Sequence, residues 1–186
     1  LVEQFSDYSK IFKEIEKIVK KGDYTLGQKV NEFEKNFAKR TGAKFAISVG
    51  NGTDALFLSL RALNIGNGDE VITTPYTFIA TIGSIATSGA KPVFVDIKND
   101  YNIDENKIES AITKKTKAIV CVHYGGLPCD MHELVRISKK NNLVLIEDSA
   151  QAHSADFWDG KAGSFGSSGW FSFYPTKNMT TSEGCM

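Results

Sequence analysis

The chain lacks any long apolar segment, and no hydrophobic run approaches the roughly 20 residues that a membrane-spanning helix needs. It also lacks an excess of charge, since 22 basic residues balance 22 acidic ones. A formal net charge of zero gives no electrostatic reason to expect a nucleic acid or an anionic membrane as partner. The first residues mix charged and apolar side chains, which argues against a signal peptide.

Cysteine is scarce as well. Cys121, Cys129 and Cys185 are an odd number and form no CxxC pair. We interpret them as free thiols in a reducing cytoplasm rather than as a disulfide framework, so the expected location of the protein is cytoplasmic.

The histidines offer little for a metal. They are widely spaced and form no HxxxH pair: His123, His132 and His153. Capping or solvated roles fit them better than ligation, so we expect no metal site. Of the three, only His153 stands beside a segment that carries other candidate residues.

What the chain does contain is the composition of a folded domain. Of its 186 residues, 41% are hydrophobic and 24% are charged, which is the ordinary globular range. This length fits one compact domain or part of a larger one.

The order of the elements predicts the fold class. After two helices that end at Gly22 and Gly42, short β-branched segments alternate with segments of helical length. The expected strands are FAISV (45–49), EVITT (70–74), KPVFVD (91–96), KAIVCV (117–122), LVLIED (143–148) and WFSF (170–173). Strands that are almost entirely apolar and separated by helices indicate a parallel sheet covered on both faces, a doubly wound α/β layer.

Ligands in such a sheet gather beyond the carboxyl ends of the strands, and the first candidate there is the turn GNGTD (50–54). Its glycines let the backbone approach a ligand, and the free N–H groups of the following helix favour an anion such as phosphate. An equally good interpretation is a plain turn in which Thr53 only caps the helix. The segment matches neither GxGxxG nor GxxxxGK[ST], which argues against a dinucleotide fingerprint and a P-loop.

The second candidate is the acidic pair Glu147–Asp148 at the end of LVLIED. Acids that end a buried strand lie near a desolvated pocket and need a partner there, although either acid could simply cap the next turn. Side chains alternate along a strand, so only one of the two can face the pocket. A carboxylate in that position could hold a proton on the ring nitrogen of a cofactor.

The third candidate is Lys177, which follows WFSF and Pro175. Most lysines are solvated surface groups, and that is the default interpretation. A lysine held inside a pocket is instead a nucleophile for a carbonyl carbon. An anion cradle, an acid and a lysine are together the groups that pyridoxal phosphate requires.

At these motifs the chain resembles the DegT/DnrJ/StrS family of pyridoxal-phosphate-dependent sugar aminotransferases. The resemblance runs from LGQKVNEFEKNFAKRTGAKFAISVGNGTDAL through PYTFIAT, VHYGGLPCDM and LIEDSAQAH to GSFGSSGWFSFYPTKNMTTSEG. It implies the large domain of fold type I, of the aspartate aminotransferase kind, with a mostly parallel sheet. It also implies a homodimer that transfers an amino group, usually from glutamate, to a ketone on a nucleotide-linked deoxysugar.

The resemblance also implies a role for each candidate residue. Lys177 would bind the cofactor covalently and then shuttle protons. Asp148 would pair with the pyridine nitrogen, and Gln151 would contact the phenolic oxygen. The remaining contacts would be made to the phosphate by Gly52, Thr53 and Ser172, and to the ring face by Phe78. A sister branch, the sugar 3-dehydrases, carries histidine in place of the lysine, and Lys177 speaks against that branch.

Some features depart from the family pattern. Ser154 and Cys185 stand where glycine is more frequent, and Gly125 stands where many relatives carry tyrosine. Members of the family are longer chains, so residues 1–186 are expected to be the N-terminal part of the large domain, without the small domain. A truncated cofactor-binding or dimerising remnant without activity is therefore the alternative to an active enzyme.

Overall fold

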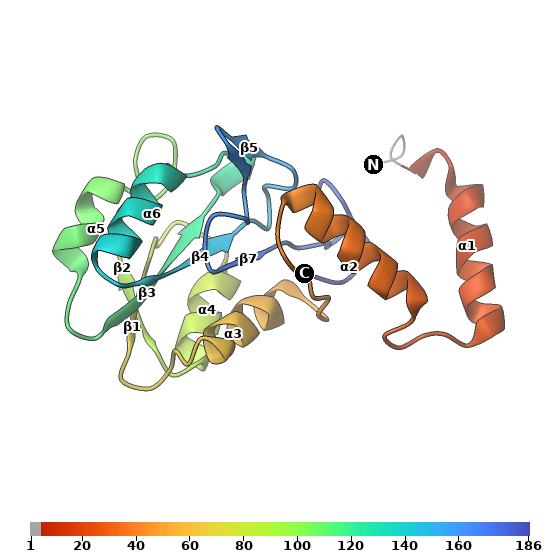
Figure 1. The fold of residues 1–186 in the computed structure, drawn as a ribbon, viewed down its shortest axis with the longest axis horizontal. Helices are drawn as coiled ribbons and strands as arrows, with labels where there is room; N and C mark the ends of the chain where they lie inside the picture. Colours follow the sequence, from red (N-terminus) through yellow and green to blue (C-terminus); the bar gives the residue numbers. More distant parts are fainter. Residues whose placement is uncertain (1–4) are drawn as a thin grey trace.

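The computed structural model of the protein describes residues 5–186, and its centre is a five-stranded sheet. The strands follow the order β2-β1-β3-β4-β7, and every neighbouring pair is parallel (Figure 1). Their bounds are β1 Glu70–Thr73, β2 Lys91–Phe94, β3 Thr116–Val122, β4 Val144–Asp148 and β7 Ser168–Trp170. The predicted parallel α/β fold is confirmed.

Helices cover both faces of this sheet (Figure 1). One face carries α3 (Gly52–Ala62) and α4 (Ile79–Thr87), and the other carries α5 (Glu105–Ala111) and α6 (Met131–Lys140). The central strand β3 shows why both faces are apolar. Its residues alternate between the two cores, with Ala118 and Val120 in the first and Ile119 and Cys121 in the second.

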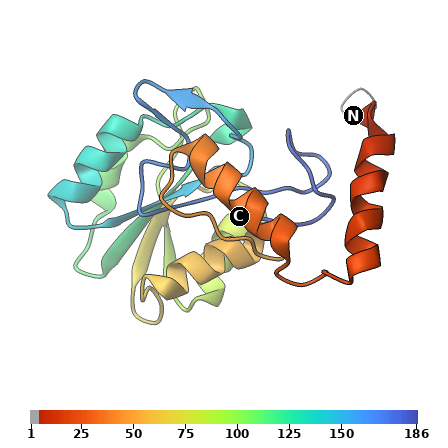
Figure 2. The same ribbon diagram turned by 45° about the vertical axis from the view of Figure 1, so that its right-hand side comes forward.

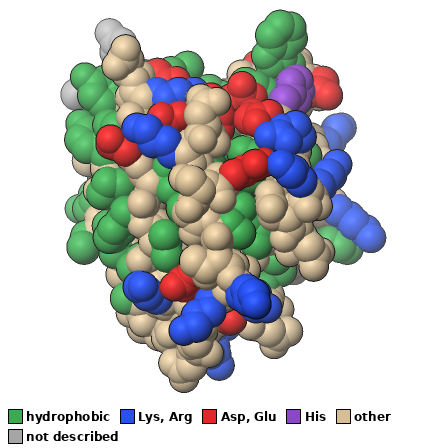
Figure 3. All heavy atoms as spheres, turned by 90° about the vertical axis from the view of Figure 1, so that its left-hand side faces the viewer, with side chains coloured by type: hydrophobic (Ala, Val, Ile, Leu, Met, Phe, Trp, Pro, Cys, Tyr) green, Lys and Arg blue, Asp and Glu red, His purple; other side chains and the backbone are tan. Residues whose placement is uncertain are grey.

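The outer side of α5 and α6 is polar. Acidic and basic side chains are interspersed on this face (Figure 3). Glu109, for example, forms ion pairs with both Arg136, at 3.4 Å, and Lys140, at 2.9 Å. A surface of mixed sign agrees with the balanced composition and presents no patch of single charge on this face.

Two helices precede the layer, and they differ in their packing. Helix α2 (Gln28–Thr41) packs through Phe37 against Phe171 and Phe173. Helix α1 (Tyr8–Lys21) stands apart from the body of the molecule and has no buried residue (Figure 2). Both helices end at glycines in the left-handed conformation, Gly22 with φ of 69° and Gly42 with φ of 77°, as predicted.

The predicted strand 45–49 is wrong. Only Val49 makes a ladder contact, pairing with Cys185 through hydrogen bonds of 2.9 and 3.0 Å. Strand geometry needs a partner along its whole length, and the rest of this segment has none among the described residues. It instead borders a hollow of about 600 Å³ that is also lined by residues of the segment 166–171.

The predicted strand 170–173 is displaced. Strand β7 ends at Trp170, because Ser172 pairs with Cys185 and no longer with β4. Cys185 thus lies between the two segments and bridges them. The remaining elements are the one-turn helix Tyr124–Gly126 and the hairpin β5 (Asp156–Phe157) and β6 (Gly160–Lys161). At its tip Trp158 is 87% exposed.

Two glycine substitutions test the packing of β7. A Cβ on Gly169 would clash with the backbone of Gly163, whereas a Cβ on Gly83 in α4 meets no atom within 4 Å. We expect Gly169→Ala to lower the free energy of unfolding by about 1–3 kcal/mol. Gly83→Ala, the matched control, should raise it by about 0.5–1 kcal/mol. Urea denaturation measures both, and equal effects would contradict the close approach of β7 to residue 163.

Candidate active site

A cavity of about 490 Å³ opens at the carboxyl edge of the sheet. Val122, Asp148 and Trp170, the last residues of β3, β4 and β7, lie in its wall. The structure brings all of the predicted site residues to this cavity: Gly52, Thr53, Phe78, Asp148, Gln151, Ser172 and Lys177. They come from separate turns, as the rule for ligand sites in parallel sheets leads one to expect.

The turn before α3 has the geometry of an anion cradle. Asn51, not Thr53, caps the helix, because its Oδ1 accepts the N–H of Asp54 at 2.9 Å. The hydroxyl of Thr53 is therefore not used for capping. Gly52 cannot carry a side chain, since its Cβ would lie 2.5 Å from the ring of Trp170. The first N–H groups of the helix have no intrahelical acceptor and border the cavity.

Asp148 is 4% exposed and faces the cavity. Thr81 Oγ1 donates to its Oδ2 at 2.7 Å, and the Ala150 N–H donates to its Oδ1 at 3.2 Å. Burial raises the pKa of Asp148 to about 6, even though both hydrogen bonds and the nearby Lys177 favour the charged form. A cationic partner beside Asp148 would therefore stabilise its charged, carboxylate form.

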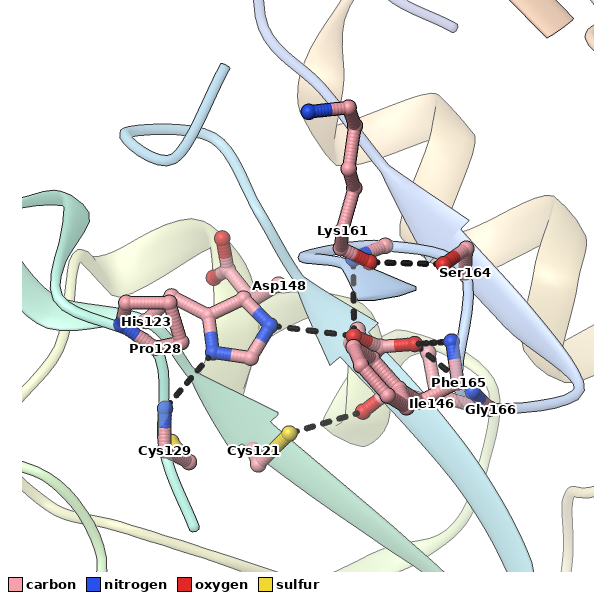
Figure 4. Close-up of polar contacts among 12 residues, drawn as sticks. Cys121, His123, Pro128, Cys129, Ile146, Asp148, Lys161, Ser164, Phe165 and Gly166 are labelled. Atoms are coloured by element: carbon pink, nitrogen blue, oxygen red, sulfur yellow. Dashed lines mark hydrogen bonds and ion pairs between the residues drawn. The ribbon is translucent and has the colours of Figure 1, made fainter. Parts of the chain in front are cut away.

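Glu147 points to the opposite side of β4 and is fully buried. Its carboxylate accepts the N–H groups of Gly163 at 2.7 Å, Phe165 at 2.7 Å and Gly166 at 2.6 Å. It also contacts Nε2 of His123 at 3.1 Å. Figure 4 shows these contacts converging on one group. Glu147 is thus occupied by the protein itself and is absent from the cavity wall.

A hydrogen bond fixes the side chain of Gln151, and another fixes the backbone of Lys177. The Gly125 N–H donates to Oε1 of Gln151 at 2.7 Å, which fixes the orientation of the carboxamide. Its NH₂ group is left as the donor for an acceptor in the cavity. The Lys177 N–H closes a turn on the carbonyl of Tyr174 at 2.9 Å, and the lysine side chain is half-buried in the cavity wall.

The structure brings together three residues that the sequence did not group. Cys121, His123 and Cys129 form a buried cluster, and their potential ligand atoms lie within 4.8 Å of one another. Counting HxxxH pairs could not find it, because β3 and the loop after it bring these residues together. His123 Nδ1 accepts the Cys129 N–H at 3.1 Å, so its lone pair is already used. The protonated nitrogen is then Nε2, which faces Glu147. The expectation that the protein has no metal site stays a prediction.

Sequence reasoning also missed Thr77 and Thr81 in the PYTFIAT motif. Their hydroxyls lie 2.9 Å apart, and Thr77 lines the cavity, so a short chain of hydrogen bonds runs from the cavity to Asp148. His153 packs against Phe171 and is not in the cavity wall. Ser154 has a φ of 62°, the left-handed region that glycine favours.

The fold agrees with that of known proteins. The structure aligns with the crystal structure of Streptomyces venezuelae DesV in complex with a ketimine intermediate, with a TM-score of 0.92 and 37% identity over 99% of this chain and 50% of that one. The architecture is that of the large domain of fold type I pyridoxal-phosphate-dependent transferases.

Sequence comparison is more specific. The chain belongs to the DegT/DnrJ/EryC1/StrS aminotransferase family, whose model matches residues 6–186. It is 49% identical to dTDP-3-amino-3,6-dideoxy-alpha-D-galactopyranose transaminase of Aneurinibacillus thermoaerophilus, over 84% of this chain and 44% of the relative. It is 44% identical to GDP-perosamine synthase of Escherichia coli O157:H7, over 91% of this chain and 45% of the relative. The chain thus spans less than half the length of these two relatives. No described helix is long and apolar enough to cross a membrane.

The raised pKa of Asp148 predicts how stability depends on pH. Between its ordinary pKa of 3.8 and about 6, the folded protein holds a proton that the unfolded chain has lost. This group therefore lowers stability as the pH rises through that window. We expect Asp148→Asn to raise the free energy of unfolding at pH 7 by about 1–3 kcal/mol, with no gain below about pH 4. Urea denaturation from pH 4 to pH 7 measures this, and a less stable variant at pH 7 would contradict it.

Glu147→Gln should lower the free energy of unfolding, in contrast to Asp148→Asn. The amide nitrogen of glutamine would face N–H donors in a fully buried site. We expect a loss of about 2–5 kcal/mol at pH 7. The same denaturation experiment checks it, with Asp148→Asn as the matched isosteric control. A neutral effect of Glu147→Gln would show that the carboxylate does not hold the loop at 163–166.

Proposed function

We propose that the protein is a pyridoxal-phosphate-dependent aminotransferase that transfers an amino group, from glutamate, to a ketone of a nucleotide-linked deoxysugar. The observation that carries the proposal is the convergence of Lys177, Asp148 and the Gly52–Thr53 turn on one cavity. The names of two relatives, a dTDP-amino-sugar transaminase and a GDP-perosamine synthase, support the substrate class.

The residues present fit the cofactor. Gly52, Thr53 and Ser172 would hold the phosphate, because all three line the cavity and the helix that begins at Gly52 offers free N–H groups there. Phe78, which is 73% exposed beside the cavity, would lie against the ring face. Gln151 would donate its NH₂ group to the phenolic oxygen.

Asp148 and Lys177 carry the chemistry on the protein side. Pyridoxal phosphate, when bound, supplies an electron sink for carbanion chemistry. Asp148 would hold a proton on the ring nitrogen of the cofactor, and that positive charge would favour the charged form of the carboxylate, which burial disfavours. Lys177 would hold the cofactor through Nζ and would move protons at the reacting carbon. Thr81 orients the Asp148 carboxylate at 2.7 Å.

We further propose that the protein works as a homodimer in the cytoplasm. Helix α1 has no buried residue and exposes Phe12, Ile15 and Val19, an apolar stripe that a subunit contact would cover. The described cysteines are free and buried, which suits a reducing compartment.

Chemical labelling tests the role of Lys177. Borohydride reduction in the presence of pyridoxal phosphate should leave the pyridoxyl mass on the peptide that contains Lys177. Lys177→Arg should abolish both the label and the transamination of nucleotide keto-sugars. Lys161→Arg is the control, since Lys161 pairs with Asp156 outside the cavity. Labelling of another lysine in the unaltered protein would overturn the assignment.

A further inference from the structure

Three tyrosines contact one another beside the cavity, and we call them the tyrosine cluster: Tyr76, Tyr101 and Tyr124. Of the three, Tyr124 lines the cavity itself. They follow β1, β2 and β3, which are neighbours in the sheet. Tyr76 stacks on Tyr101 with ring centroids 5.5 Å apart and an interplanar angle of 27°. Tyr124 lies 4.8 Å from Tyr76 and 5.6 Å from Tyr101. None of these residues was singled out from the sequence.

The tyrosine cluster is held rigidly from beneath. Asn102, which is 1% exposed, accepts the Tyr124 N–H at 3.1 Å and donates to the carbonyls of Leu127 and Pro128 at 3.2 Å. Tyr101 has a φ of 67°, a strained conformation for a bulky residue. The Tyr124 hydroxyl donates to the Tyr76 hydroxyl at 3.1 Å. Strain of this kind persists where the surrounding structure fixes it, and it concentrates at ligand sites.

The tyrosine cluster is continuous with the active-site cavity and open to ligand. Tyr124 lines the same cavity as Lys177. Tyr76 and Tyr101 are 42% and 51% exposed, so much of their ring surface is free although the rings are already ordered. A ligand that reaches out of the cavity past Tyr124 meets these rings without first ordering them.

The charges around the tyrosine cluster indicate an uncharged ligand group. Lys98 begins the turn that carries Tyr101, whose N–H bonds to the Lys98 carbonyl at 3.0 Å. The Lys98 ammonium is already paired with Glu105 at 2.9 Å and with Asp100 at 3.6 Å. The turn therefore offers no free cation to a diphosphate. Flat, partly exposed rings without a free cation suit a neutral planar group.

We propose that the tyrosine cluster binds the nucleobase of the nucleotide-linked substrate by stacking. The inference rests on the proposed function, in which the reacting sugar carbon lies beside Lys177 inside the cavity. The base is then the planar part that extends outward, past Tyr124, to Tyr76 and Tyr101. Stacking tolerates different bases because each has a π-face. A base-tolerant platform agrees with relatives whose names carry dTDP in one case and GDP in another.

Nucleotide binding to the protein loaded with pyridoxal phosphate tests the proposal. Isothermal titration with dTDP and with GDP should show about tenfold weaker binding for Tyr76→Leu and for Tyr101→Leu, the loss expected for one stacked base. Tyr76→Phe should bind as the unaltered protein does, because it keeps the ring. Tyr8→Leu is the control, since Tyr8 is 63% exposed on α1. Pyrophosphate, which has no base, should bind all variants equally.

Proton NMR gives a second measurement that does not depend on affinity. The H6 proton of thymine and the H8 proton of guanine should shift upfield on binding, because they lie over aromatic rings. The shift should shrink in Tyr101→Leu and remain in Tyr8→Leu. The proposal that the tyrosine cluster binds the nucleobase would be contradicted if both leucine variants kept the nucleotide affinity of the unaltered protein. It would also be contradicted if they lost pyrophosphate binding as much as nucleotide binding.

Failure of the platform and failure of the proposed function give different results. If Lys177 is not labelled by the cofactor, the aminotransferase proposal fails. If Lys177 is labelled but base protons show no ring-current shift, only the nucleobase site fails.

Discussion

The buried carboxylate of Glu147 is the constraint on which the geometry of the site depends. It collects three backbone N–H groups from the loop 163–166 and the imidazole of His123. His123 in turn receives the Cys129 N–H, so the loops that follow β3 and precede β7 are both tied to one point on β4. A charge buried without these partners would cost several kcal/mol, about the whole stability margin of many domains. The arrangement is therefore cooperative, since the carboxylate and the loops need each other.

The position of Asp148 follows from this anchor. Because side chains alternate along β4, fixing Glu147 on one side turns its neighbour toward the cavity. Two adjacent acids thus have opposite surroundings. Glu147 accepts hydrogen bonds from backbone N–H groups, whereas Asp148 has a pKa raised to about 6 by burial and would be stabilised in its charged form by a cationic partner. One strand end thereby supplies both the support for the neighbouring loops and a buried acid that faces the cavity.

Much of the fold could be predicted from the sequence, because apolar strands and helical segments alternate along the chain. The grouping of Thr53, Asp148 and Lys177 followed from the rule that parallel strands end at one edge. Local pattern failed where the outcome depends on distant residues. The segment 45–49 reads as a strand, yet its state is decided by Cys185 near the other end of the chain. The cluster of Cys121, His123 and Cys129 and the contact of Thr81 with Asp148 likewise need tertiary geometry that no spacing reveals.

The pairing of Val49 with Cys185 has a consequence for the order of folding. Val49 directly precedes the Gly50–Thr53 turn, so the placement of that turn depends on a contact with Cys185, which is far away in the sequence. Contacts of such long separation form slowly, because the entropy of closing the loop is lost before the contact is gained. The local α/β units, whose contacts are shorter in sequence, are therefore expected to form before Val49 and Cys185 pair, and this edge of the cavity is expected to be completed late in folding.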